Sequence, residues 1–300
     1  MDALIQALVA ANFAPERIIP RAPMARYTTF RVGGPADVLV NIADAREIAT
    51  ALRAARHAGV PTTIIGNGSN LLVRDGGIRG LVIRIAGDCA GIRREENKLY
   101  AKAGISMSAA AQFALSEGLS GLAEMAGIPG TLGGGVIMNA GAYGGEIAQV
   151  CQSVDVMVRD GSIITVPASE MGFSYRHSYL EDTFGVVVGA VFALTKREEE
   201  EVRGQMQELL KKRKASQPLE YPSAGSAFKR PVGGYAAALI DETGLKGYRV
   251  GDAAVSEKHA GFVVNLGCAT AQDVINLLES VSDQVFDRTG IRLEPEVRIW

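Results

Sequence analysis

The sequence predicts a mixed α+β fold that is divided into more than one domain. Three observations support this prediction: a capped helix that runs into a strand at residues 44–65, a β-hairpin at 153–166, and a second capped helix near the C-terminus. The chain has 300 residues, and domains commonly contain about 100–200 residues. We therefore expect two or three compact units, each with its own core.

The first predicted helix is marked at both ends. Asp44 is a typical N-cap residue, Ile48 and Leu52 lie on one apolar stripe, and Gly59 ends the pattern. The β-branched residues of 61–65 then predict a strand. This order of elements is typical of an α/β start.

The middle of the chain mixes short helices with strands. Residues 106–117 predict a helix that Gly118 closes, and residues 153–158 and 163–166 predict a hairpin. Residues 196–214 are acidic at the front and basic at the back, which complements a helix dipole. We expect this polar helix to connect domains with its charges in solvent, and we assign those charges no catalytic role.

The last third predicts a β-α-β unit. Residues 262–266 form the first strand, Thr270 and Asp273 cap the helix that follows, and residues 291–300 form the closing strand. No internal repeat or low-complexity tract interrupts this pattern.

Composition excludes several classes of protein. A hydrophobic share of 47% with 21% charged residues indicates a globular chain, and a net charge of −2 gives no basic field for nucleic acid. The longest nearly uncharged apolar run, near residues 185–194, is shorter than the roughly 20 residues of a membrane-spanning helix. Residues 1–8 lack the basic start of a signal peptide. We therefore expect a cytoplasmic monomer whose partners are small molecules alone.

The cysteines indicate free thiols. Cys89, Cys151 and Cys268 are odd in number and widely spaced, and no CxxC pair suggests a zinc site or a redox dithiol. We expect neither a disulfide nor a bound metal.

Two glycine-rich segments are the first candidates for a binding site. Residues 66–70, GNGSN, follow the predicted strand directly, where a bare backbone can bring N–H groups against a pyrophosphate. A Rossmann site is disfavoured because Leu71 replaces the third glycine, and no GxxxxGK[ST] motif is present. Residues 127–135 are too rich in glycine for an efficient helix or strand interior, and residues 138–145 prolong this small-residue surface. Either cluster alone is more often a plain turn.

Several motifs together resemble the UDP-N-acetylenolpyruvoylglucosamine reductase family. The resemblance follows the chain in order over nearly its whole length, at residues 28–37 (TTFRVGGPAD), 66–73, 126–146 (AGIPGTLGGGVIMNAGAYGGE), 175–178 (YRHS), 221–229 (YPSAGSAFK), 251–253, 256–261 (SEKHAG) and 293–298 (LEPEVR). We find no additional substrate-covering segment, so the chain resembles the shorter subtype of the family.

The resemblance implies a two-subdomain FAD-binding fold of the vanillyl-alcohol-oxidase (PCMH) type, followed by a smaller α/β substrate-binding domain. We place the first at 1–200, with subdomains of about 1–95 and 96–200, and the second at 201–300. The only histidine before residue 177 is His57, inside a predicted helix, so we expect FAD to be bound non-covalently. NADPH is the expected co-substrate.

The resemblance also implies the binding residues. We expect the cofactor to contact Gly66, Asn67, Gly68, Ser69, Asn70, Leu71, Gly127, Ile128, Pro129, Gly130, Thr131, Gly133, Gly134, Asn139, Gly141 and Ala142. For the substrate, UDP-N-acetylenolpyruvoylglucosamine, we expect Tyr143, Tyr175, Lys229, Arg230 and Arg298. Packed aromatic residues are an equally good interpretation of the two tyrosines. The family pattern has Asn where this chain has Arg230, so the contact to the UDP portion differs here.

Reduction of an enolpyruvyl ether, in which reduced FAD supplies the hydride, requires a proton donor and groups that stabilise the enolate. The resemblance implies Ser226 as the proton donor, aided by Lys229, and Glu296 and Arg176 as the stabilising groups. Local sequence alone favours a turn serine and a surface ion-pair ladder of Arg292, Glu294, Glu296 and Arg298, and it leaves Arg176 undecided between structural and functional roles. His177 is expected to be a neighbour rather than a proton carrier.

Two other functions remain open from the sequence. Residues 226–229 also satisfy the S-x-x-K motif of acyl-serine hydrolases, although the companion S-D-N and K-T-G motifs are missing. A non-catalytic flavin-binding protein is the third interpretation, but simple binding does not require Ser226, Glu296 and Arg176 together.

Overall fold

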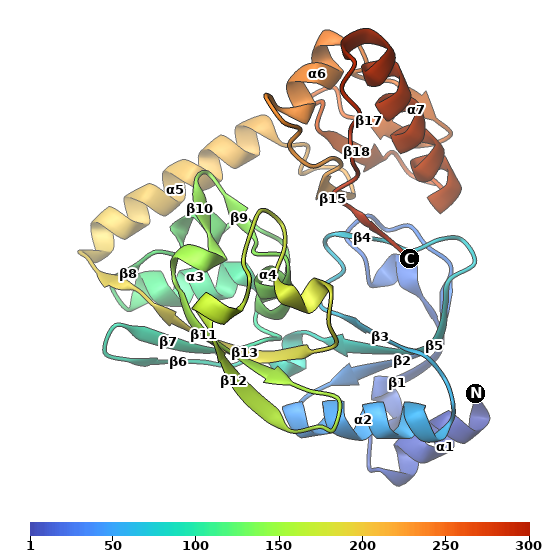
Figure 1. Cartoon of the computed structure of the whole chain (residues 1–300), viewed down its shortest axis with the longest axis vertical. Coiled ribbons are helices and arrows are strands. Elements are labelled where there is room, and N and C mark those ends of the chain that lie inside the picture. Colours follow the sequence, from blue (N-terminus) through green and yellow to red (C-terminus); the bar gives the residue numbers. More distant parts are fainter. The chain divides into compact units, whose positions relative to one another are not determined.

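Segments that are far apart in the sequence come together in two units in the computed structural model, which describes residues 1–300 (Figure 1). The first unit contains Met1–Ile19, Val38–Asn67 and Gly80–Arg213, and the second contains Pro20–Asp37, Gly68–Arg79 and Lys214–Trp300. Each unit has its own cluster of buried apolar side chains. The domain limits of 1–200 and 201–300 stay a prediction, and the two units follow a different division of the chain.

A four-stranded sheet begins the fold. Its strand order is β1-β2-β5-β3, formed by β1 (Ile18–Pro23), β2 (Pro35–Ile42), β5 (Ile78–Ile85) and β3 (Thr62–Ile65). Helices α1 (Asp2–Ala10) and α2 (Ala45–His57) pack against each other beside it (Figure 1). Leu4, Leu8 and Ile48 of these helices are fully buried in the same cluster as Val38 and Leu81.

The second sheet of the first unit is antiparallel. Its order is β12-β11-β13-β7-β6, formed by β12 (Ile163–Pro167), β11 (Cys151–Met157), β13 (Val186–Ala193), β7 (Lys98–Lys102) and β6 (Ile92–Glu95). Helix α4 (Leu132–Ile137) packs on β13 and β7 of this sheet, and α3 (Met107–Ser116) packs against α4. Strands β11 and β12 pair from Ser153 with Pro167 to Met157 with Ile163, which confirms the predicted hairpin.

The predicted helices form because their ends are capped as the sequence indicates. The Asp44 side chain accepts the N–H of Arg46 at the start of α2, and Ser106 accepts the N–H of Ala109 at the start of α3. The polar segment forms α5 (Glu199–Ser216). Each of these predictions is confirmed within three residues.

The second unit contains a four-stranded antiparallel sheet and two helices. Its order is β15-β18-β17-β16, formed by β15 (Ser223–Ser226), β18 (Phe262–Asn265), β17 (Ala253–Val255) and β16 (Arg249–Val250). Helix α6 (Ala236–Glu242) contacts α7 (Ala271–Thr289), which covers β16 and β17. Thr270 and Asp273 form a reciprocal capping box at the start of α7, as predicted.

The predicted closing strand at 291–300 is wrong for most of its length. Only β19 (Arg298–Ile299) is regular, and it pairs in parallel with β4 (Leu71–Leu72) rather than joining the sheet that contains β18. The predicted β-α-β unit is therefore wrong too. Pro295 has no N–H, which limits ladder formation, and the segment forms one isolated bridge there with Phe228.

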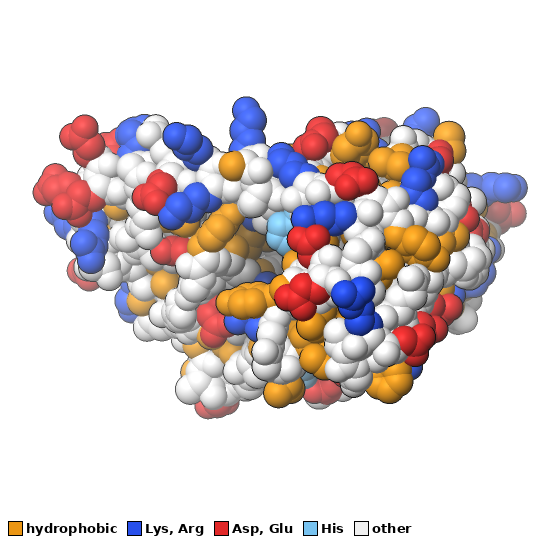
Figure 2. All heavy atoms as spheres, turned by 90° about the horizontal axis from the view of Figure 1, so that it is seen from above, with side chains coloured by type: hydrophobic (Ala, Val, Ile, Leu, Met, Phe, Trp, Pro, Cys, Tyr) orange, Lys and Arg blue, Asp and Glu red, His pale blue; other side chains and the backbone are white.

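The remaining elements are short. They are the strands β8 (Leu119–Ser120), β9 (Gly141–Ala142), β10 (Gly145–Glu146) and β14 (Thr195–Lys196), with 3₁₀ turns at Pro15–Arg17, Met24–Arg26, Gly87–Cys89, Ala123–Met125, Ile147–Gln149, Ala168–Glu170 and Tyr179–Glu181. None of the helices has the length and apolar character that crossing a bilayer demands. Acidic and basic side chains are intermingled on the face drawn in Figure 2, in agreement with the net charge of −2.

The three cysteines differ sharply in exposure, and all are free. Burial raises the pKa of Cys151 to about 12 and also raises the pKa of Cys89, whereas Cys268 is exposed.

Because the thiolate is the nucleophile, we predict that iodoacetamide modifies Cys268 alone in the native protein at pH 8 and all three cysteines in guanidinium. Peptide mass spectrometry measures this. Rapid native labelling of Cys151 would contradict the packing described here.

Candidate functional site

The loop at residues 66–70 contains a row of unused backbone donors. The N–H groups of Asn67, Gly68, Ser69 and Asn70 donate to no acceptor of the protein, although all four residues are partly buried. Buried backbone donors are nearly always paired, because an unpaired N–H costs free energy. Successive N–H groups in a turn are suited to an anion such as a pyrophosphate.

Glycine is required in this loop by close contacts. A Cβ on Gly66 would lie 2.1 Å from Oγ1 of Thr131, at the start of α4. Gly68 has a φ of +61°, and a Cβ there would lie 2.2 Å from the carbonyl oxygen of Tyr27. The first contact joins the two glycine-rich segments that the sequence singled out.

The second glycine-rich segment is helical where the sequence predicted neither helix nor strand. Helix α4 includes Gly133, Gly134 and Gly135. A Cβ on Gly133 would lie 2.9 Å from Cβ of Ala103, and one on Gly135 would lie 2.9 Å from Sδ of Met107. Tertiary packing at this short range offsets the low helix propensity of glycine. The prediction was wrong because it used propensity alone.

Gly134 differs from its two neighbours in α4. Gly134 is exposed, and a Cβ built there would meet only Oγ1 of Thr131, at an ordinary contact distance of 3.5 Å. Its bare backbone is therefore accessible to a flat ligand. The segment before α4 is held from the other side, because the N–H of Met107 donates to the carbonyl of Gly130.

A tight hairpin follows α4. Strands β9 and β10 pair Ala142 with Gly145, and the two turn residues, Tyr143 and Gly144, have φ values of 54° and 89°. Two positive φ values are typical of a type I′ turn. Tyr143 is 44% exposed there, so its phenol is available for contact.

Arg176 lies at the tip of a second tight turn. Ser174 and His177 exchange backbone hydrogen bonds of 3.1 and 3.2 Å, and Arg176 has a φ of 56°. This region is unfavourable for an arginine, and such strain commonly costs about 1–3 kcal/mol and is concentrated at functional sites. The guanidinium donates to the carbonyl of Gly141 at 3.1 Å and lies 5.0 Å from the ring centre of Tyr175.

Asn139 and Ser178 hold this turn against the end of α4. The fully buried Asn139 amide donates to the carbonyl of Ser174 and accepts the N–H of Ala148, at 3.0 and 2.9 Å. The Ser178 hydroxyl donates to the carbonyl of Ile137 at 2.7 Å. The side chain of Asn139 therefore positions the Arg176 turn, a role that the sequence did not suggest for this expected cofactor contact.

Ser226 ends β15 immediately after a bulge. Four residues of β15, from Ser223 to Ser226, face three of β18, from Val264 to Phe262, and Gly225 in the bulge has a φ of 80°. Bulges of this kind redirect side chains. Ser226 is exposed, and its hydroxyl has no hydrogen-bond partner within the protein.

Glu296 lies beside Ser226 through backbone pairing. The N–H of Glu296 donates to the carbonyl of Ala227, and the N–H of Lys229 donates to the carbonyl of Glu294, both at 2.9 Å. Residues 226–229 are therefore next to 294–296 within the second unit. The shared role of Ser226 and Glu296 stays a prediction.

Asn70 fixes the backbone on both sides of Val297. Its amide donates to the carbonyl of Glu296 at 3.1 Å, and its own carbonyl accepts the N–H of Arg298 at 3.0 Å. Leu71 continues the pairing with Arg298 in the short parallel ladder. The expected cofactor loop and the segment that carries Glu296 are thus joined by direct hydrogen bonds.

The expected substrate residues of the second unit have other partners as well. Lys229 contacts Glu294 at 3.3 Å, and the guanidinium of Arg230 lies 4.5 Å from the ring centre of Tyr235. The expected support of Ser226 by Lys229 stays a prediction.

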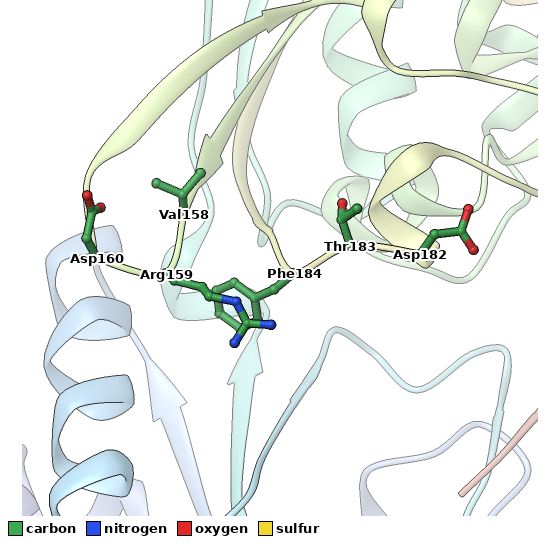
Figure 3. A pocket seen from close by; sticks show the side chains of 6 residues that line it. All are labelled: Val158, Arg159, Asp160, Asp182, Thr183 and Phe184. Carbon is green, nitrogen blue, oxygen red and sulfur yellow. The ribbon is translucent and has the colours of Figure 1, made fainter.

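One open hollow contains none of the predicted site residues. Its volume is about 620 Å³, and it is lined by Val158, Arg159, Asp160, Asp182, Thr183 and Phe184 (Figure 3). The Arg159 guanidinium lies 4.8 Å from the ring centre of Phe184, which places it in cation–π range. Asp182 pairs with His177 at 2.9 Å, consistent with a neighbouring role for that histidine.

Comparison with known proteins decides the family. The chain is 47% identical over 286 residues to UDP-N-acetylenolpyruvoylglucosamine reductase 2 of Symbiobacterium thermophilum, covering 95% of this chain and 93% of that protein. It is 44% identical to the UDP-N-acetylenolpyruvoylglucosamine reductase of Levilactobacillus brevis, covering 99% and 97%. The chain belongs to the UDP-N-acetylenolpyruvoylglucosamine reductase family.

The reductase family match extends to structure. The crystal structure of UDP-N-acetylenolpyruvylglucosamine reductase from Thermus caldophilus is similar with a TM-score of 0.80 and 40% identity, covering 94% of this chain and 98% of that one. Residues 36–167 match the FAD binding domain family, and residues 217–300 match the C-terminal domain of UDP-N-acetylenolpyruvoylglucosamine reductase. The predicted fold class and the prediction of an FAD-dependent reductase are confirmed.

The contact between Gly66 and Thr131 gives a test of cofactor binding by this reductase family member. We predict that Gly66→Ala weakens FAD binding about tenfold or more, equivalent to about 1.4 kcal/mol, because the new Cβ displaces the loop from Thr131. Gly76→Ala is the matched control, since a Cβ there meets nothing within 4 Å. Fluorescence titration of each apoprotein with FAD measures the effect. Equal affinities for the two variants would contradict this account.

Proposed function

We propose that this protein reduces the enolpyruvyl double bond of UDP-N-acetylenolpyruvoylglucosamine, with NADPH as the source of electrons, to give UDP-N-acetylmuramate for peptidoglycan synthesis. The observation that carries the proposal is identity of 44–47% to reductases named for this substrate over more than nine-tenths of the chain. Non-covalently bound FAD would accept a hydride from NADPH and deliver one to the substrate. We further propose that the reaction takes place in the cytoplasm on a monomeric enzyme.

The residues present fit the cofactor. The unpaired N–H groups of residues 67–70 would bind the pyrophosphate, and the exposed backbone of Gly134 leaves room for a flat ring. The other expected cofactor contacts, such as Ile128, Pro129 and Ala142, belong to the chain segments on either side of α4. These contacts are part of the proposal.

Arg176 is proposed to bind the enolpyruvyl carboxylate. A guanidinium can bind a carboxylate through two parallel hydrogen bonds, and it carries the positive charge that an enolate-like intermediate needs. The bond from Arg176 to the carbonyl of Gly141 fixes the orientation of the side chain. The strained φ of Arg176 agrees with selection of this turn for function rather than for stability.

Ser226 is proposed to donate the proton, with Glu296 stabilising the developing charge. The Ser226 hydroxyl has no hydrogen-bond partner within the protein, so no internal bond must break before it donates. An enolate carbon is basic enough to take a proton from a hydroxyl group. The backbone pairing of Ala227 with Glu296 keeps the glutamate in the neighbourhood of the serine.

The S-x-x-K interpretation is disfavoured by the same segment. A hydrolase of that type requires the lysine to act on the serine, but the Lys229 ammonium contacts the Glu294 carboxylate at 3.3 Å. We therefore retain a single proposed function.

Separate measurement of the two half-reactions tests the role of Ser226. We predict that Ser226→Ala leaves anaerobic reduction of the flavin by NADPH within about twofold of wild type. Reoxidation by the enolpyruvyl substrate should slow by about 100-fold or more, because a positioned proton donor contributes about 10²–10⁴-fold. Stopped-flow absorbance of the flavin follows both steps.

Ser223→Ala, in the same strand, is the control and should leave both half-reactions unchanged. Equal slowing of both half-reactions by Ser226→Ala would remove the serine from its proposed role. Failure of the wild-type flavin to be reoxidised by the enolpyruvyl substrate would refute the proposed function itself.

A further inference from the structure

Helix α5 carries one charged residue on its buried face. Val202 and Met206 are buried and Leu209 is partly buried, and the spacing of four and three residues defines one side of the helix. Arg213 is four residues further on and occupies the next position of this stripe. We expected the basic residues of 211–214 to lie in solvent, which is wrong for Arg213, since it is partly buried while its basic neighbours are exposed.

Arg213 packs directly on the second glycine-rich segment. A Cβ on Gly127 would lie 2.6 Å from Cδ of Arg213, 3.1 Å from Nη1 and 3.2 Å from Nε. The guanidinium therefore occupies the space that the missing side chain of Gly127 leaves. A second contact holds the helix in place, because the Gln205 amide donates to the Glu124 carboxylate at 2.7 Å.

The charge of Arg213 has no partner in the protein. It forms no ion pair and no hydrogen bond, whereas Lys212 beside it pairs with Glu208. Burial lowers the pKa of the Arg213 guanidinium, and the nearby Tyr143 offsets this only in part. Removing a guanidinium from water without a partner is costly, so an apolar residue at this position would stabilise the protein alone better.

We propose that Arg213 supplies a permanent positive charge to the flavin site and stabilises the reduced, negatively charged flavin ring. The inference rests on the proposed function. Gly127, which the guanidinium covers, begins the segment expected to bind FAD, and Tyr143 lies near the end of that segment. A permanently bound cofactor offers hydrogen-bond acceptors to the buried guanidinium in both redox states, whereas a substrate that comes and goes does so only briefly.

The charge balance explains the effect on the flavin. Transfer of a hydride from NADPH adds two electrons and one proton to the oxidised ring, so the ring system gains one negative charge and NADP⁺ leaves. A fixed positive charge favours the reduced form over the oxidised form. Arg213 therefore raises the reduction potential of the bound flavin.

The experiment compares reduction potentials of FAD-loaded protein. Arg213→Met removes the charge at similar length, Arg213→Gln removes the charge but keeps hydrogen-bond donors, and Arg213→Lys keeps the charge. Lys212→Met, at an exposed and ion-paired position on the same helix, is the control. Anaerobic titration against a redox dye of known potential gives the midpoint of each holoprotein.

We expect Arg213→Met and Arg213→Gln to shift the reduction equilibrium at least about tenfold toward the oxidised flavin, which is about 30 mV for a two-electron couple. Arg213→Lys and Lys212→Met should stay within about threefold of wild type, which is roughly 15 mV on the same scale. A wild-type midpoint for Arg213→Gln and Arg213→Met would overturn the proposal, even if turnover falls. If Arg213→Met does not retain FAD, Arg213→Gln decides alone.

Failure of the Arg213 inference can be distinguished from failure of the proposed function. Wild-type protein that binds no FAD, or whose reduced flavin is not reoxidised by the enolpyruvyl substrate, would refute the function. If the flavin binds and reacts with the substrate, but its reduction potential is the same in wild type and in the Arg213 variants, only the inference about Arg213 is refuted.

Discussion

The unpaired backbone N–H groups of residues 67–70 are the constraint on which the proposed site depends. Four neighbouring, partly buried N–H groups in this loop donate to no protein acceptor, and a bound anion would complete their hydrogen bonds. Side chains would prevent this conformation. Gly66 packs on Thr131 and Gly68 on the carbonyl of Tyr27, at separations that leave no room for a Cβ.

From this loop, hydrogen bonds extend to the proposed chemistry. Asn70 uses its amide and its carbonyl to hold the backbone of Glu296 and Arg298, and Ala227 holds Glu296 from the other side, next to Ser226. In the first unit, Asn139 and Ser178 anchor the turn that carries Arg176 to the end of α4. Glu296 and the Arg176 turn are thus held by hydrogen bonds that involve residues in or next to the glycine-rich segments.

Local signals in the sequence predicted much of the fold. The caps at Asp44 and Thr270 and the alternation in 153–166 are encoded by residues close to one another, and these elements formed as expected. Helix α4 was missed because its glycines are stabilised by Ala103 and Met107, which are distant in sequence. The prediction of the closing strand was wrong because the pairing depends on Pro295 and on its partner segment near Phe228. The periodicity of a segment does not reveal which segment it pairs with.

The candidate site was predicted from motifs rather than from geometry. The glycine-rich segments and Ser226 were recognisable, but the structural use of Asn139 and the pairing of Lys229 with Glu294 depend on tertiary contacts. Arg213 was missed although a signal exists, because its spacing from Val202, Met206 and Leu209 places it on the apolar stripe of α5.

The most direct measurement is the flavin content of the purified protein before and after denaturation. The account predicts a yellow protein with about one FAD per chain, all of which passes a filter once guanidinium unfolds the loop at residues 66–70. A colourless protein that takes up no added FAD, or flavin that stays attached to the unfolded chain, would contradict the central claim.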